Sequence, residues 1–156
     1  MPETMTELVD LLVSYELATP ATILSCSPDQ VEEIRVAQGV DRLPPQYEEF
    51  LLTMGRRAGD LLLGTDFFYP FVVELIDEMR ELLADNLVEH LVRPGSVLVG
   101  MHQGYELYWL EPGDPSGPLY YYTEGKDAPI RDWPTLLDFL VWQAGEQRRL
   151  RADGSY

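Results

Sequence analysis

The sequence predicts an α+β fold, in which a single domain contains an antiparallel β-sheet flanked by helices. Three features support this prediction. Apolar residues recur at helical spacing through most of the N-terminal half, short aromatic-rich segments follow Pro94-Gly95, and helical spacing returns after Trp133-Pro134. A length of 156 residues fits one domain. We expect this domain to span residues 1–147 and residues 148–156 to form a flexible C-terminal tail.

Two capped helices are expected first. Thr4 and Glu7 have the spacing of a capping box, which predicts a helix over residues 4–15. Ser27-Pro28-Asp29-Gln30 combines a serine cap, a proline at the first helical position and a glutamine that can reach back to the cap. A second helix is therefore expected from Ser27 to Gly39, because glycine readily adopts the left-handed conformation that ends a helix.

The third helix is expected to begin at Pro44-Pro45 and to end at Gly55. Its apolar residues recur at i, i+3, i+4 and i+7, as in a helix with one buried face. They are Tyr47, Phe50, Leu51 and Met54. The apolar run 61–63 follows, ends at Gly64, and is interpreted as a short strand.

The longest helix is expected to begin at Pro70 and to break near Asn86, before a short helical turn that reaches Leu91. One face of this helix is apolar. In a straight helix, with 100° of rotation per residue, five acidic residues fall together on the opposite face. They are Glu74, Asp77, Glu78, Glu81 and Asp85.

Strands and a last helix complete the prediction. Residues 97–99 and 105–110, separated by Gln103-Gly104, are expected to form a β-hairpin, and residues 119–122 a third strand. The last helix is expected after Pro134. Three arginines lie at or beyond its C-terminal end, where positive charge complements the helix dipole: Arg148, Arg149 and Arg151.

The charge of the chain argues against several classes of partner. Twenty-seven Asp and Glu residues face eleven Lys and Arg residues, and the formal net charge is −16. This charge repels nucleic acid and anionic membranes and speeds encounter with basic partners. No apolar run approaches the ~18 residues of a membrane span. Because the N-terminus lacks a signal-peptide pattern and the chain has one cysteine, we expect a cytoplasmic protein.

The residues that could carry catalysis do not form a catalytic pattern. Cys26 precedes a helix, which favours a thiolate, but a nucleophile also needs a base, and the spacing of His90 and His102 links neither to it. The histidines also lack further donors at the spacing of a metal site. We therefore expect a protein that is not an enzyme and that needs no cofactor or metal.

The aromatic strands are a second candidate site. Their tyrosines and Trp109 could stack on nucleic-acid bases, as in single-strand-binding proteins. Such proteins bind through basic grooves, whereas this region has four acidic residues against Lys126 alone: Glu106, Glu111, Asp114 and Glu124. Packing of the strands against helices is the better interpretation, and nucleic acid is not expected as a partner.

The acidic face of the helix after Pro70 remains. A solvated helix surface would also explain this pattern. Two observations favour binding. Between residues 74 and 85 only Arg80 offers a countercharge, and like charges at Glu74/Glu78 and Glu81/Asp85 destabilise a helix by roughly a few tenths of a kcal/mol each. A surface that retains such repulsion is compatible with a basic ligand.

The block Leu43-Pro44-Pro45-Gln46-Tyr47-Glu48-Glu49-Phe50-Leu51, followed by Met54-Gly55, resembles the SUKH superfamily. This superfamily contains bacterial immunity proteins and fungal cell-wall-synthesis regulators of the Smi/Knr type. The resemblance covers residues 27–144 and implies a SUKH-like domain. Members often carry Asn-Gly-Gly after this helix, whereas this chain has Gly55-Arg56-Arg57.

The resemblance implies binding without chemistry, since many bacterial members block a cognate secreted toxin. We therefore expect an immunity protein that neutralises a basic toxin domain through an acidic surface. The expected contacts are Glu74, Asp77, Glu78, Glu81 and Asp85, with Glu106 and Glu111 as a second contact. The alternative is a regulatory or scaffold protein in cell-envelope or signalling pathways, as the fungal members suggest. The sequence leaves the oligomeric state open.

Overall fold

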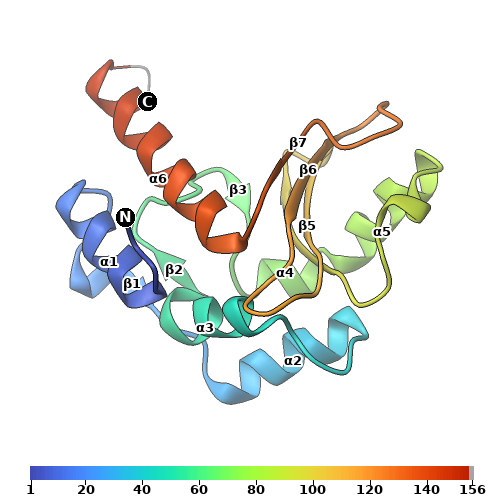
Figure 1. Cartoon of the computed structure of the whole chain (residues 1–156), viewed down its shortest axis with the longest axis horizontal. Helices are drawn as coiled ribbons and strands as arrows, with labels where there is room; N and C mark the ends of the chain where they lie inside the picture. Colours follow the sequence, from blue (N-terminus) through green and yellow to red (C-terminus); the bar gives the residue numbers. More distant parts are fainter. Residues whose placement is uncertain (155–156) are drawn as a thin grey trace.

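The β-sheet lies between two groups of helices (Figure 1). The computed structural model describes residues 1–154, which form a single α+β domain, as the sequence predicted. Its antiparallel five-stranded sheet has the order β3-β4-β5-β6-β7. The strands are β3 (Thr65–Asp66), β4 (Val97–His102), β5 (Glu106–Leu110), β6 (Leu119–Thr123) and β7 (Arg131–Trp133). The predicted hairpin is confirmed, because Met101 of β4 pairs with Leu107 of β5.

The N-terminal helices begin and end close to where their caps predict. They are α1 (Met5–Ser14), α2 (Pro28–Gln38) and α3 (Pro45–Met54). Ser27 and Gln30 form the reciprocal capping box that begins α2, and Gly39 ends this helix with a φ of 71°. Between α1 and α2 lie η1 (Pro20–Thr22) and β1 (Ile23–Leu24), and β1 pairs with β2 (Arg57–Ala58) in a separate two-stranded sheet.

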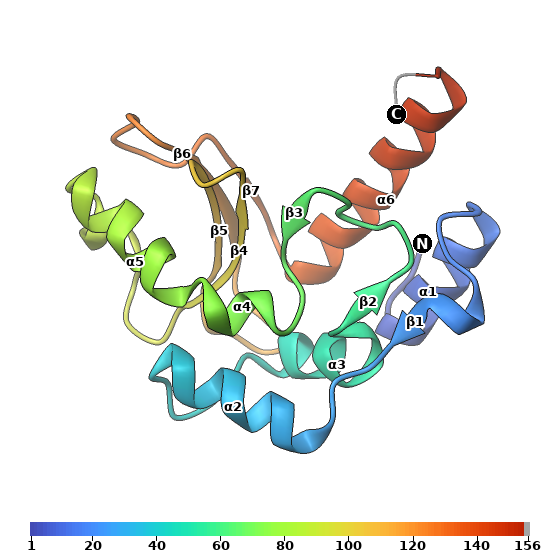
Figure 2. The ribbon, with the colours of Figure 1, turned by 180° about the vertical axis from the view of Figure 1, so that it is seen from behind.

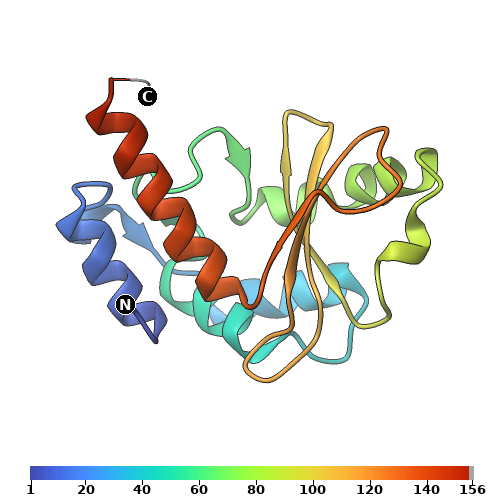
Figure 3. The same cartoon turned by 45° about the horizontal axis from the view of Figure 1, so that its top comes forward.

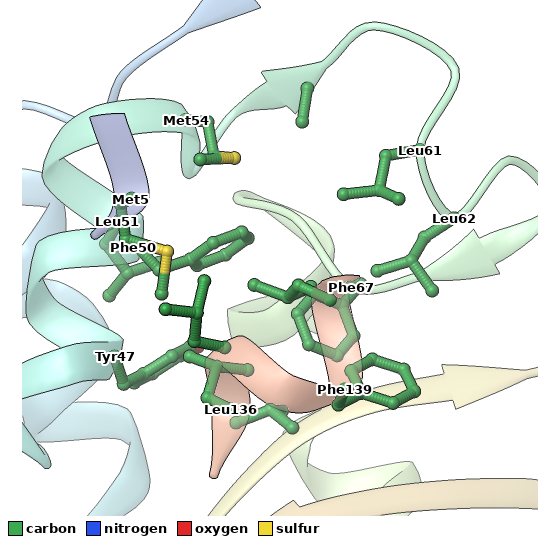
Figure 4. Close-up of a cluster of buried hydrophobic side chains, with 14 of the residues drawn as sticks. Met5, Tyr47, Phe50, Leu51, Met54, Leu61, Leu62, Phe67, Leu136 and Phe139 are labelled. Atoms are coloured by element: carbon green, nitrogen blue, oxygen red, sulfur yellow. The ribbon is translucent and has the colours of Figure 1, made fainter. Parts of the chain in front are cut away.

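One face of the main sheet packs on the larger of two cores, shown in Figure 4. This larger core joins α1, α2, α3, α4 (Phe71–Glu74) and α6 (Leu136–Ala152) to the sheet. Tyr47, Phe50 and Leu51 are fully buried in it, so the apolar residues of the Leu-Pro-Pro block serve the core, as the sequence predicted. The ring of Phe50 meets the ring of Phe67 edge-on, with centroids 5.7 Å apart.

The opposite face of the sheet packs on the smaller core, which α5 (Ile76–Asp85) and η2 (Glu89–Leu91) cover (Figure 2). Met79 and Leu83 of α5 meet Leu107 and Trp109 of β5 there. Tyr108, between these two strand residues, packs on the larger core, as the alternation of a strand requires. The aromatic strands thus pack against helices on both faces.

The prediction of one long helix after Pro70 is wrong. The chain forms α4 and α5 with a break at Leu75, whose φ and ψ are −98° and 5°. Val72 of α4 packs on the larger core, whereas Ile76 of α5 packs on the smaller core, so the chain must change direction between them. Among the described residues α6 is the longest helix. The predicted end of the helix at Asn86 is confirmed.

The strand predicted at residues 61–63 is also wrong. These residues lie in turns between β2 and β3, where Leu62 has a φ of 59°. A left-handed backbone does not continue a strand. Leu61 and Leu62 point into the larger core (Figure 4). The two- or three-residue strands β1, β2, β3 and β7 were not predicted, because they are too short to show an alternating pattern.

Helix α6 continues beyond residue 147, where we expected the folded domain to end. It reaches Ala152, and Arg151 binds both the Glu16 carbonyl oxygen and the Asp60 carboxylate, each at 2.8 Å. Residues 155–156 of the predicted tail lie outside the described residues. No helix within residues 1–154 combines the length and apolar character that crossing a membrane requires.

Candidate functional site

The outer face of α5 forms one wall of an acidic hollow of about 450 Å³. Four carboxylate side chains line it, together with Leu82, Met101 and Gly104. The four are Glu78, Glu81, Asp85 and Glu124. Each belongs to an exposed residue. Three of the predicted contact residues therefore share one surface depression, and Glu124 joins them from outside the helix.

Asn86 explains how Glu124 reaches this hollow. At the C-terminal end of α5, its side-chain amide donates to the Leu82 carbonyl oxygen at 2.8 Å and accepts from the Gly125 N–H at 2.7 Å. On the other side, the Glu124 N–H donates to the Tyr105 carbonyl oxygen at 2.9 Å, next to the β4–β5 turn. Sequence reasoning missed Glu124 as a site residue. Glu124 lies just after the predicted third strand, and pairing of that strand with the hairpin would have indicated that Glu124 lies beside the hairpin turn.

Positive charge does little to neutralise the hollow. Arg80 lies 3.9 Å from Asp77, but its guanidinium also donates to the Ala37 carbonyl oxygen at 2.9 Å and is therefore held against the C-terminal end of α2. Asp77 and Glu78 in the first turn of α5 stabilise the helix through its dipole, whereas the negative charge of Asp85 in the last turn destabilises it. Helix stability therefore does not account for Asp85.

Glu74 is separated from the other predicted residues. It belongs to α4, before the break at Leu75, and its charge acts on the Tyr69 hydroxyl. That hydroxyl donates to the Glu33 carboxylate at 2.7 Å, and this hydrogen bond is the main reason that the pKa of Tyr69 is raised. Glu74 thus lies near α2 and is not among the residues that line the acidic hollow.

Neither Glu106 nor Glu111, the residues expected to form a second contact with the partner, lines the acidic hollow. Glu106 lies on the same sheet face as Tyr108, opposite α5. The pKa of Tyr121 is raised mainly by burial and further by its interaction with the Glu106 carboxylate. The Glu111 residue is 6% exposed, and its carboxylate lies 3.5 Å from the Arg93 guanidinium. A buried, paired carboxylate is poorly placed to meet a partner.

The residues considered for chemistry lie apart. Cys26 is buried, and the loss of solvation raises the pKa of its thiol to about 11, although Arg56 opposes this shift. The Nδ1 atom of His102 lies 2.9 Å from the Thr65 hydroxyl, and His90 is exposed on η2. Across residues 1–154, no three His, Cys, Asp or Glu side chains are grouped as metal ligands would be.

Comparison with known proteins adds no relative, since neither a scan of protein-family models nor a search of curated proteins finds a match. The resemblance to the SUKH superfamily therefore remains a prediction from the residues of the Leu-Pro-Pro block.

Proposed function

We propose that this chain is a non-enzymatic binding module that recognises a basic protein through the acidic hollow, and that it acts as a cytoplasmic immunity protein against a toxin domain. The observation that carries the proposal is the convergence of Glu78, Glu81, Asp85 and Glu124 from two separate parts of the chain. Asn86 holds those parts together.

The charge of the hollow suits such a partner. A basic protein that inserts a Lys or Arg side chain gains ion pairs and is attracted over a longer range. The repulsion between the carboxylates is relieved when the partner binds, so charges that oppose the helix in isolation favour the complex. Asp77 lies on the same helix but does not line the hollow, and Glu74, Glu106 and Glu111 are not included either.

Binding is tested by co-purification with the protein encoded beside the gene of this chain, followed by calorimetry of the purified pair. The variant Glu81→Lys/Asp85→Lys should weaken binding by about 100-fold or more, because it replaces attraction by repulsion. The control Glu3→Lys/Asp10→Lys makes the same change of charge just before and within α1, across the molecule from α5 (Figure 1). Equal affinity of the two variants would exclude the hollow as the binding surface.

A growth assay separates an immunity protein from a scaffold. The neighbouring protein is expressed in a heterologous host, with and without this chain. We expect it to arrest growth, and we expect the wild-type chain, but not Glu81→Lys/Asp85→Lys, to restore growth. If the neighbouring protein binds without arresting growth, the regulatory or scaffold alternative replaces the toxin-neutralising function.

A further inference from the structure

A second surface hollow of opposite character lies between β2 and β3. It has a volume of about 330 Å³ and is lined mainly by apolar side chains, with Arg56 and Arg57 at its rim. Two large apolar side chains on it are exposed: Leu63 is 67% exposed and Phe71 is 48% exposed. Exposed apolar residues that gather around a groove, with charged groups at the edge, are typical of binding surfaces.

The loop that builds this groove is held firmly by α6, beside which it lies (Figure 3). The buried Gln147 accepts a hydrogen bond from the Leu62 N–H and donates one to the Asp60 carbonyl oxygen, both at 2.6 Å. The Asp60 carboxylate also pairs with Arg151. These contacts hold Leu62 in a left-handed conformation that a bulky residue seldom adopts. The surrounding structure therefore maintains a strained loop, which presents Leu63 to solvent.

The charge at the rim favours an acidic ligand. Arg56 and Arg57 each use Nε to bind a backbone carbonyl oxygen, of Ser25 and Gly59 respectively. In the described part of the chain neither arginine is paired with a carboxylate. Asp66 is the one carboxylate among the lining residues, so the groove keeps a positive excess in a chain whose net charge is −16.

The groove and the acidic hollow are separate surfaces. β3 and the preceding loop lie on the side of α6, whereas α5 lies across the main sheet (Figure 2). A basic protein attracted to the acidic hollow would be repelled by Arg56 and Arg57. The groove therefore suits a different ligand from the one that the acidic hollow suits.

We propose that this groove binds a short peptide segment of a partner protein that carries both apolar and carboxylate side chains. The apolar side chains cover Leu63 and Phe71 and reduce the apolar area exposed to water. The carboxylates pair with Arg56 and Arg57, whose planar guanidinium groups suit bidentate contacts. Because Gln147 already orders the loop, less entropy is lost on binding than with a mobile loop. This proposal stands independently of the toxin-binding proposal.

Selection from a phage-displayed library of random dodecapeptides tests the groove directly. The intact chain should enrich peptides that contain Asp or Glu together with Leu, Ile, Phe or Trp. The affinity of the best peptide is then measured by fluorescence anisotropy. We expect Arg56→Glu/Arg57→Glu to weaken it by about tenfold or more. We expect Leu63→Ser/Phe71→Ser to weaken it by a similar factor, because two exposed apolar contacts are lost.

The variant Arg42→Glu/Lys126→Glu is the control, since it makes the same change of charge at exposed residues outside the groove. It should leave the affinity within about twofold, as expected for charges away from an interface. The proposal is overturned if no acidic–apolar peptides are enriched, or if the control weakens binding as much as Arg56→Glu/Arg57→Glu does. Enrichment of basic peptides alone, bound at Glu81 and Asp85, would also overturn it, while supporting the proposed function.

Discussion

The two faces of the main β-sheet are built differently. The larger core gathers side chains from five helices, and two buried glutamines join distant parts of the chain around it. Gln46 of α3 accepts from the Leu137 N–H of α6 at 2.9 Å, and Gln147 holds the loop before β3. The smaller core depends chiefly on α5 and η2. Gln38 of α2 connects to this smaller core, because its side chain exchanges two hydrogen bonds with the backbone of Leu98.

This difference separates residues that serve folding from residues that are free to serve binding. A helix that packs on other elements around most of its circumference has little surface to vary. Helix α5 packs on the sheet along one side, and its opposite side carries charges that the core does not require. We therefore expect stability to depend mainly on the larger core and affinity on the outer face of the smaller one.

Matched core truncations should show the largest effects. Leu51 in the larger core and Leu83 in the smaller core are both buried leucines in helices. We expect Leu51→Ala to lower the free energy of unfolding by about 4 kcal/mol and Leu83→Ala by about 3 kcal/mol, because tightly enclosed sites relax less around a cavity. Urea unfolding measures both values. A greater loss of stability for Leu83→Ala would contradict the expectation that the larger core contributes more to stability than the smaller one.

Removal of a buried glutamine tests the links between distant segments. Gln147→Leu should lower the free energy of unfolding by about 2–3 kcal/mol, because the hydrogen bonds of its side chain with the Leu62 N–H and the Asp60 carbonyl oxygen are lost. Glu146→Leu on the same turn removes an ion pair with Arg149 near the surface and should cost less than about 1 kcal/mol. Thermal unfolding followed by circular dichroism compares the two, and equal losses would mean that Gln147 is not an anchor.

Alkaline pH tests the environment of Cys26 in the larger core. Folding raises its pKa from 9.0 to about 11, so the native state holds the thiol proton more tightly than the unfolded state. The resulting stabilisation is complete below pH 9 and disappears as the pH rises to about 11. Urea unfolding from pH 8 to 11 should show a loss on the order of 2 kcal/mol that Cys26→Ala lacks. An identical pH profile for the two proteins would show that the thiol is not protected.

Neutralisation of the acidic hollow should have the smallest effect on stability, and in the opposite direction. Asp85→Asn removes a carboxylate from the last turn of α5 and should raise the free energy of unfolding by about 0.3–0.5 kcal/mol at low salt. High salt should abolish the gain, because the interaction lies at the surface. Thermal unfolding at two salt concentrations measures it. If this substitution instead destabilises the protein, the Asp85 carboxylate contributes to folding, and its charge would not indicate a role in binding.

Local signals predicted much of the fold because they act within a few residues. The caps of α1 and α2 and the apolar stripe of α3 predicted those helices to within a residue or two, and Gln103-Gly104 marked the hairpin. The candidate site was predicted in part. Glu78, Glu81 and Asp85 share a helix face because helical periodicity alone places them there.

The errors arose where contacts between distant residues decide the conformation. The break at Leu75 depends on two cores that lie on opposite faces of a sheet formed later in the chain. The turns at residues 59–64 depend on Gln147, and the burial of Glu111 accompanies its contact with Arg93. Such contacts leave no mark in the spacing of neighbouring residues.

The sequence by itself determined the α+β class, the ends of α1, α2 and α3 and the acidic character of α5, because caps, periodicity and composition are properties of short segments. Tertiary structure alone decided that Glu124 joins Glu78, Glu81 and Asp85, and that Arg56 and Arg57 border an apolar groove. The physical reason is that a binding surface is defined by proximity in space, which follows from packing and hydrogen bonds between segments far apart in the chain.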